Sequence, residues 1–236
     1  MLLKLLPQML VDGLQLGFVY AIVALGYTMV YGVLHFINFA NAEIFMCGAF
    51  IGAEVLIALL GAAAGGGWTV FAFAVALLAA LVLTGLLGVF IERVAYRPLR
   101  SAPRLVPLIS AFGVSYFWQD FVRVAETFAN NSFYLTLPSI FKREFVLNEY
   151  TKVTVRAILI VGVCLAALAI LYTFIHRTKV GSAIRCVSQN QTMSALLGIH
   201  VNKTITTTFF VGAAMGGVAG TMFAIQYGMI NPYIGI

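Results

Sequence analysis

The sequence contains few charged residues. Asp, Glu, Lys and Arg together make up 9% of its 236 residues, whereas hydrophobic residues make up 62%. Soluble domains usually carry about a quarter charged residues, so this composition excludes an ordinary soluble protein. A transmembrane helix needs about 20 apolar residues to cross a bilayer, and several stretches of that length occur. The composition therefore predicts an all-α, polytopic membrane protein.

Sequence motifs of several enzyme and metal-binding classes are absent. There is no G-x-x-x-x-G-K-[ST] loop to hold the phosphates of ATP, no H-E-x-x-H and no G-x-S-x-G. The three cysteines, Cys47, Cys164 and Cys186, show no C-x-x-C spacing, which favours free thiols over a disulfide or a metal site. We therefore expect no catalytic site, no metal and no cofactor.

Six apolar stretches predict membrane spans. They cover residues 8–34, 43–60, 69–91, 105–128, 153–175 and 206–227. No linker or internal repeat divides the sequence, so residues 1–236 are predicted to form a single transmembrane domain. The N-terminal MLLKLLPQML has no small-residue cleavage site and continues directly into the first span, which argues against a cleaved signal peptide.

The distribution of basic residues predicts the orientation. The loops after the third and fifth spans carry Arg93, Arg97, Arg100, Arg104, Arg177, Lys179, Arg185 and Lys203. The opposite face carries fewer, namely Lys4, Lys142, Arg143, Lys152 and Arg156. Because Lys and Arg gather in cytoplasmic loops, those two loops are placed in the cytoplasm and both termini outside. The same bias accounts for the net charge of +6 without any binding of nucleic acid.

An unusually long polar stretch separates the fifth and sixth spans. Thirty residues, 176–205, lie between the apolar runs, although a short turn would suffice to return the chain. Residues 181–199, GSAIRCVSQNQTMSALLGI, predict a loosely amphipathic surface helix that stops at Gly198. Such a helix either rests on lipid head groups or docks onto a cytoplasmic partner, and both interpretations remain open from the residues alone.

Polar residues also interrupt the apolar sequence between the first and second spans. Asn38, Asn41 and Glu43 lie there, close to or inside the membrane. A charged residue at bilayer depth is costly and usually faces a polar cavity or a partner, so these residues are candidates for a substrate path. The alternative is a cytoplasmic turn in which an Asn caps the next helix and Glu43 lies in its first turn. His35 with Glu43 is the one candidate pair for an intramembrane enzyme.

Glycines at four-residue spacing predict close helix packing. They occur as one pair and one triplet, Gly13 and Gly17, and Gly212, Gly216 and Gly220. Packing within the chain is favoured over a subunit interface. In the loop 92–104, Pro98 predicts a turn, and the Arg residues around it either anchor the loop or contact a partner or anionic lipid.

Four segments in order resemble the inner-membrane permease subunits of branched-chain amino acid ABC transporters: residues 13–43, 91–100, 181–199 and 230–235. The resemblance implies transport by alternating access in a multi-pass protein of the bacterial inner membrane. It implies a translocation core around Asn38, Asn41 and Glu43. It also implies a coupling helix for the ATPase that contains Gly181, Arg185, Gln189, Ala195, Leu197 and Gly198. The implied partners are a second permease, two cytoplasmic ATPase subunits, a periplasmic substrate-binding protein and membrane lipid.

The sequence departs from the family pattern at two places. Asn41 and Ala42 stand where members usually have His-Gly, and Asn cannot take up a proton near neutrality, so urea or an amide is an alternative substrate. Typical members also continue with further spans after the INPYIG motif, so we expect the chain to be C-terminally short for its family. A non-functional truncated permease and an autonomous secondary transporter or channel are the alternative functions, although the latter would need more intramembrane charge.

Overall fold

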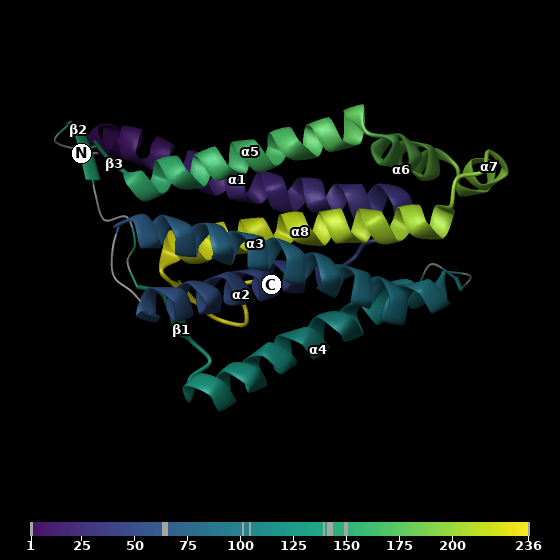
Figure 1. Ribbon diagram of the computed structural model, residues 1–236, viewed down its shortest axis with the longest axis horizontal. Helices are drawn as coiled ribbons and strands as arrows, with labels where there is room; N and C mark the ends of the chain where they lie inside the picture. The colour runs from purple at the N-terminus through teal and green to yellow at the C-terminus, as the bar shows by residue number, and fades with distance from the viewer. Residues whose placement is uncertain are drawn as a thin grey trace.

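Long helices dominate the computed structural model, which describes residues 2–62, 66–100, 102–103, 105–138, 140, 144–148 and 151–235 (Figure 1). The helices are α1 (Leu2–Leu34), α2 (Ala40–Ala62), α3 (Gly66–Ile91), α4 (Leu105–Asn130), α5 (Val155–Arg177), α6 (Lys179–Gln189), α7 (Gln191–Leu196) and α8 (Val201–Tyr227). Six helical segments are long and apolar enough to cross a membrane: Leu6–Leu34, Ala40–Gly61, Gly67–Leu99, Leu105–Asn130, Val155–Arg177 and Val201–Tyr227. The predicted all-α class and the six spans are confirmed.

Helix α8 starts earlier than the apolar pattern predicted, at Val201 rather than near residue 206. Of the Thr residues in its first turns, Thr204 was expected in the loop, and its hydroxyl donates to the His200 carbonyl at 3.2 Å. The hydroxyl groups of Thr206, Thr207 and Thr208 donate to the backbone carbonyls four residues earlier, at 2.9–3.0 Å. Because these bonds satisfy the hydroxyls inside the helix, the polar residues extend α8 instead of ending it.

Helix α8 forms the centre of the bundle. In its most apolar window 83% of the residues are buried, against 17% in α4, which lies at one edge (Figure 1). The backbones of α8 and α2 touch at Gly48 and Gly217, so closely that a Cβ on Gly48 would overlap Gly217. A Cβ on Gly217 would instead overlap Ala80 and Thr84 in α3. Thr221 donates a hydrogen bond across the same contact to the Gly48 carbonyl at 3.2 Å. Small residues thus set the distance between the central helices.

The two groups of spaced glycines lie in different environments. Gly212 approaches the backbone of Gly26 in α1, and Gly220 approaches that of Phe45 in α2. Gly216 makes an ordinary contact, 3.5 Å from Ile44 to the position of its Cβ. Gly13 and Gly17, in contrast, are exposed, with no heavy atom of the described residues within 4 Å of an added Cβ. The expected intrachain packing at this pair is absent, because it lies on the outer face of α1.

The segment after α3 continues as helix where a turn was predicted. Residues Glu92–Tyr96 form a π-helical segment in which the Arg97 N–H bonds to the Glu92 carbonyl, and Arg97–Leu99 form a 3₁₀ helix. Pro98 lies in the first turn of that 3₁₀ helix, where its missing N–H costs no hydrogen bond. The wider π turn brings Glu92 and Tyr96 to the buried side.

Among the described residues, four short strands lie outside the helices. β1 (Leu135–Thr136) pairs with β4 (Met229–Ile230), and β2 (Glu144–Asn148) pairs with β3 (Thr151–Thr154), both antiparallel. The β2–β3 hairpin lies at the end of the bundle opposite α6 and α7 (Figure 1). The connection between α4 and α5, which carried no structural expectation, is therefore partly ordered by strand pairing.

The end of the bundle that carries α6 and α7 also carries the connection between α3 and α4 (Figure 1). The two loops that the basic residues assign to one side of the membrane thus lie together. Three residues used in that assignment, Arg104, Lys142 and Arg143, lie outside the described residues. We call this end of the molecule the coupling end.

Replacing Gly220 with Ala is expected to destabilise the bundle, because the added methyl group would meet the backbone of Phe45 and Ala49. Overpacking of this kind typically costs about 1–3 kcal/mol. Gly13→Ala is the matched control, since it adds the same group to an exposed helical glycine. Thermal unfolding of the detergent-solubilised chain should show a lower midpoint for Gly220→Ala alone. Equal midpoints would contradict the packing described here.

Candidate substrate path and coupling segment

The connection between α1 and α2 turns back into the protein. Helix α1 ends at Leu34, and His35 adopts the left-handed conformation, with φ 57°. The His35 N–H still bonds to the Tyr31 carbonyl at 2.8 Å, which closes the last turn. His35 itself is exposed, whereas Glu43 is buried, so the structure gives no support to this pair as an enzymatic site.

All three residues predicted for the substrate path are buried. Asn38, Asn41 and Glu43 are each at most 3% exposed. The Asn38 Oδ1 accepts a hydrogen bond from the Tyr96 hydroxyl at 2.6 Å, and the Glu43 Oε1 accepts one from Ser115 Oγ at 2.9 Å. Glu43 also lies in the first turn of α2, as the capping alternative expected, and the substrate path stays a prediction. We call Asn38, Asn41 and Glu43 the polar corner.

Two polar atoms of this corner have no hydrogen-bond partner among the described residues. They are the Asn38 Nδ2, a donor, and the Glu43 Oε2, an acceptor. An unpaired buried polar group costs roughly 1–3 kcal/mol, so such groups usually have a specific role. A Cβ built on Gly235 would lie 3.3 Å from the same Glu43 oxygen, so the C-terminal INPYIG segment lies against the corner as well.

A pocket of about 480 Å³ opens beside the polar corner, between α1 and the α1–α2 connection. Asn38 and Asn41 contribute its polar groups, and the remaining lining is aromatic or aliphatic: Tyr20, Val23, Ala24, Tyr27, Ile37, Phe39 and Ala42. On the side of α4, Phe39 stacks on Phe112 with ring centroids 4.1 Å apart. The corner thus combines an apolar pocket with a few convergent polar groups, the usual composition of a small-molecule site.

The predicted coupling helix consists of two helices. Thr178 caps α6 by accepting a hydrogen bond from the Gly181 N–H at 3.0 Å. The chain becomes extended at Asn190, whose Oδ1 accepts from the Met193 N–H at 3.0 Å and caps α7. Because Asn favours such a cap over a mid-helix position, the single helix expected over 181–199 is broken there.

Two glycines allow the tight turns at the two ends of the coupling segment. Gly181 lies against the carbonyl groups of Phe174 and Ile175 at the end of α5, where a Cβ would overlap them. Gly198 has φ 82°, and its N–H bonds to the Ala195 carbonyl at 3.0 Å. The left-handed glycine ends α7, as the sequence indicated.

One face of the coupling segment is exposed. Ile184 and Val187 are buried against the bundle, while Arg185 and Gln189 lie on the outer side of α6. Ala195 and Gly198 are exposed as well. At the tip, Leu196 and Leu197 are each 78% exposed. Neighbouring exposed Leu residues beside charged and polar groups are typical of a protein-binding surface.

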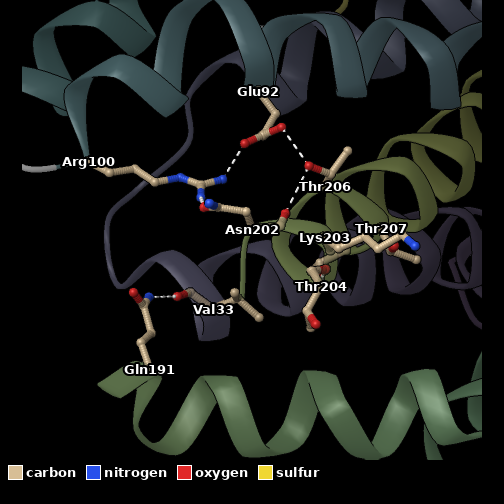
Figure 2. A network of polar contacts seen from close by, with 10 residues as sticks. Val33, Glu92, Arg100, Gln191, Asn202, Lys203, Thr204, Thr206 and Thr207 are labelled. Carbon is tan, nitrogen blue, oxygen red and sulfur yellow. Dashed lines mark hydrogen bonds and ion pairs between the residues drawn. The ribbon is translucent and has the colours of Figure 1, made fainter. Parts of the chain in front are cut away.

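The coupling segment is joined to the end of α1 by a hydrogen bond. The Gln191 Nε2 donates to the Val33 carbonyl at 2.8 Å (Figure 2). Carbonyls in the last turn of a helix lack partners within the helix, so this bond satisfies a group that α1 leaves free. Val33 precedes His35 by two residues, and α7 therefore contacts the chain directly before the polar corner.

A second polar network fastens the π-helical segment to α8. The buried Glu92 carboxylate pairs with Arg100 and accepts a hydrogen bond from Thr206 at 2.9 Å (Figure 2). Arg100 also donates to the Asn202 Oδ1 at 2.6 Å. Burial lowers the pKa of the Arg100 guanidinium and the Glu92 charge opposes that change. Removing one partner of such a pair would leave an uncompensated buried charge.

Residues 9–236 match a family described as the permease component of branched-chain amino acid transport systems. This chain belongs to that permease family. It is 39% identical over 233 residues to LivH, a high-affinity branched-chain amino acid transport system permease protein of Escherichia coli (strain K12), covering 97% of this chain and 73% of LivH. It is 40% identical over 234 residues to BraD of Pseudomonas aeruginosa, covering 97% of this chain and 74% of BraD. No solved structure matches the chain.

The family membership confirms the main functional expectation. The chain is a permease subunit of an ABC importer and a multi-pass protein of the inner membrane. It is a transport subunit rather than an enzyme, and permeases of this family work with ATPase and binding-protein partners.

Sequence reasoning missed several residues that shape this permease. Tyr96 and Gln191 reach partners 58 and 158 residues away in the sequence. Ser115 lies in an apolar span and gave no signal of its own. The resemblance did mark the segments that contain Tyr96 and Gln191, and this was the available clue to their contacts with the corner and with α1.

The variant Tyr96→Phe should destabilise the permease, because it leaves the buried Asn38 Oδ1 without its donor. A loss of roughly 1–3 kcal/mol is expected. Tyr116→Phe on the exposed face of α4 removes the same hydroxyl at an exposed position and should change stability little. Thermal unfolding in detergent measures both variants. Unchanged stability of Tyr96→Phe would show that this hydrogen bond does not hold the corner.

Proposed function

We propose that this permease moves branched-chain amino acids through the polar corner, driven by ATP hydrolysis in separate subunits that dock on α6 and α7. The observation that carries the proposal is the contact between Gln191 and the Val33 carbonyl. This contact joins the exposed coupling segment to the residues that precede Asn38. A docked ATPase subunit would thereby be connected to the polar corner.

The chemistry of the corner supports an amino acid as the substrate. The unpaired Asn38 Nδ2 is a donor suited to a carboxylate, and the unpaired Glu43 Oε2 is an acceptor suited to an ammonium group. The adjoining pocket is lined by aliphatic groups such as Val23 and Ile37, which suit a branched side chain. Urea and simple amides lack both the charged groups and the aliphatic part. The substrate named for LivH and BraD is also a branched-chain amino acid.

The exposed face of the coupling segment is the proposed ATPase contact. Arg185 and Gln189 provide polar contacts, and Leu197 provides an apolar one. Gly181, which is buried, and Gly198 allow the turns at the two ends of the segment. Ala195 and Gly198 are exposed and complete the surface. In this arrangement the chain, acting as a single permease domain, provides no ATP site itself.

The proposed assembly contains this permease, a second related permease, two cytoplasmic ATPase subunits and a periplasmic binding protein. The basic residues of the coupling end support its cytoplasmic location. The opposite end, with the β2–β3 hairpin (Figure 1), then faces the periplasm and the binding protein. Alternating access would open the pocket beside the corner to each side in turn.

Co-expression with its genomic neighbours is expected to yield one complex that contains ATPase and second-permease subunits. The variant Leu197→Asp places a charge on the proposed contact and should release the ATPases while the second permease stays bound. Met229→Asp changes an exposed apolar residue in β4 at the other end and should retain them. Co-purification from mild detergent measures both variants.

The same complex, reconstituted in vesicles, should take up leucine in an ATP-dependent manner and leave urea outside. Recovery of the chain alone, with leucine uptake independent of ATP, would contradict the proposal and favour an autonomous transporter. Recovery of the chain alone without uptake would favour a non-functional permease.

A further inference from the structure

A cationic pocket lies at the coupling end, away from the polar corner. It has a volume of about 450 Å³ and is formed between the π-helical segment and the first turns of α8. Arg93 and Arg97 line it from one side, and His200, Lys203 and Thr207 from the other. Lys203 and Thr207 lie together on α8 in Figure 2. We call this the Arg93–Lys203 pocket.

The positive charge of this pocket is uncompensated. No carboxylate lines it, and no ion pair in the described part of the chain involves Arg93, Arg97 or Lys203. Glu92 is the nearest acid along the chain, but its two oxygens are bound to Arg100 and Thr206. Three cationic side chains converging on one hollow attract an anion.

The π-helical segment and the first turn of α8 both contribute positive charge to the pocket. Arg93 and Arg97 are four residues apart, about one turn in the π-helical segment, so they project to the same side. Across the pocket, α8 begins at Val201 without a side-chain cap. Its first backbone N–H groups add their partial positive charge to that of Lys203.

The surroundings of the pocket identify the class of anion. Leu86 and Phe90 in α3 and Val94 in the π-helical segment follow one another at four-residue spacing, and each is more than half exposed. They form an apolar strip that leads from the middle of the span to the level of Arg93 and Arg97. An anion held here with acyl chains attached would lay those chains along this strip.

The position of the pocket separates it from the proposed ATPase contact. Helix α7, with the exposed Leu residues at its tip, lies farther out along the bundle than the start of α8 (Figure 1). The pocket instead lies where the last residues of an apolar span meet the polar end of the molecule. Basic pockets between membrane helices on the cytoplasmic side bind anionic head groups.

We propose that the Arg93–Lys203 pocket binds the phosphate of an anionic phospholipid of the cytoplasmic leaflet. The bound phosphate shares its negative charge among Arg93, Arg97 and Lys203, while the acyl chains cover the strip of Leu86, Phe90 and Val94. Because the pocket joins the π-helical segment to α8, the lipid would reinforce the contact that Glu92, Arg100 and Thr206 make beside it. This inference is independent of the substrate.

Native mass spectrometry of the full chain in mild detergent, titrated with phosphatidylglycerol, tests the proposal. Each cationic residue near a membrane surface strengthens the binding of anionic lipid about five-fold. The variant Arg93→Gln/Lys203→Gln should therefore weaken retention by about 25-fold. The control Arg177→Gln/Lys179→Gln removes two exposed basic residues at the same end and should change it less than two-fold. Phosphatidylcholine should show no difference among the three proteins.

Further variants keep the test decisive. Arg93→Lys should retain the lipid because the charge is kept, and Lys203→Gln alone should lose about five-fold if the double variant fails to fold. Unchanged lipid retention in the Gln variants, or an equal loss in the control, would overturn the proposal.

Two outcomes would assign the pocket to another ligand. If glycerol 3-phosphate displaces phosphatidylglycerol at equal concentration, the pocket is a site for small soluble anions and the lipid assignment is wrong. If the Gln variants retain lipid but lose the ATPase subunits in the co-expressed complex, the cationic residues form a protein contact and the proposal is again overturned.

Discussion

The contact of α8 with the helices around it depends on the absence of side chains where their backbones meet. Gly48 and Gly217 bring α2 and α8 together, and Gly26 and Gly212 do the same for α1 and α8. Thr221 adds a hydrogen bond across the first of these contacts. With α8 in the centre, its first turns contact the π-helical segment. Helix α7 precedes α8 in the chain, and Gln191 at its start contacts the end of α1. The positions of the coupling segment and of the polar corner therefore both follow from this packing.

The segments that carry the family resemblance meet around one corner of the fold. Tyr96 binds Asn38, Gln191 binds the carbonyl of Val33, and Gly235 lies against Glu43. These contacts join residues far apart in the sequence, and they connect the exposed face of the coupling segment to a buried group of polar atoms. In the proposed mechanism, movement of α6 and α7 reaches the polar corner through the end of α1. The proposed lipid site lies outside this connection and acts on the stability of the neighbouring π-helical segment.

The sequence was sufficient to predict the six spans, the buried polar residues of the corner and the turn glycine Gly198, because each depends on local composition or on a local backbone requirement.

The sequence was not sufficient where a residue pattern does not determine which neighbour a helix face contacts. Gly13 and Gly17 have the same spacing as Gly212 and Gly216, yet they face outward, since spacing defines a helix face and not its neighbour. The π-helical segment was missed because Pro98 predicts a turn as readily as a change of helix type. Asn190 is a residue type that caps helices, but the amphipathic pattern on both sides of it predicted one continuous helix. Contacts such as Tyr96 with Asn38 depend on tertiary packing and leave no local signal.

We propose that α7 acts on the polar corner through the bond from Gln191 to the Val33 carbonyl. The most direct test is leucine-stimulated ATPase activity and uptake in the reconstituted complex with Gln191→Glu, which keeps the shape of the side chain but removes its donor. Thr192→Ala, at the adjacent exposed position, is the control. Gln191→Glu should leave assembly and basal ATP hydrolysis normal and reduce stimulation and uptake about ten-fold, the change that corresponds to about 1.4 kcal/mol. Full stimulation and uptake in Gln191→Glu would contradict it.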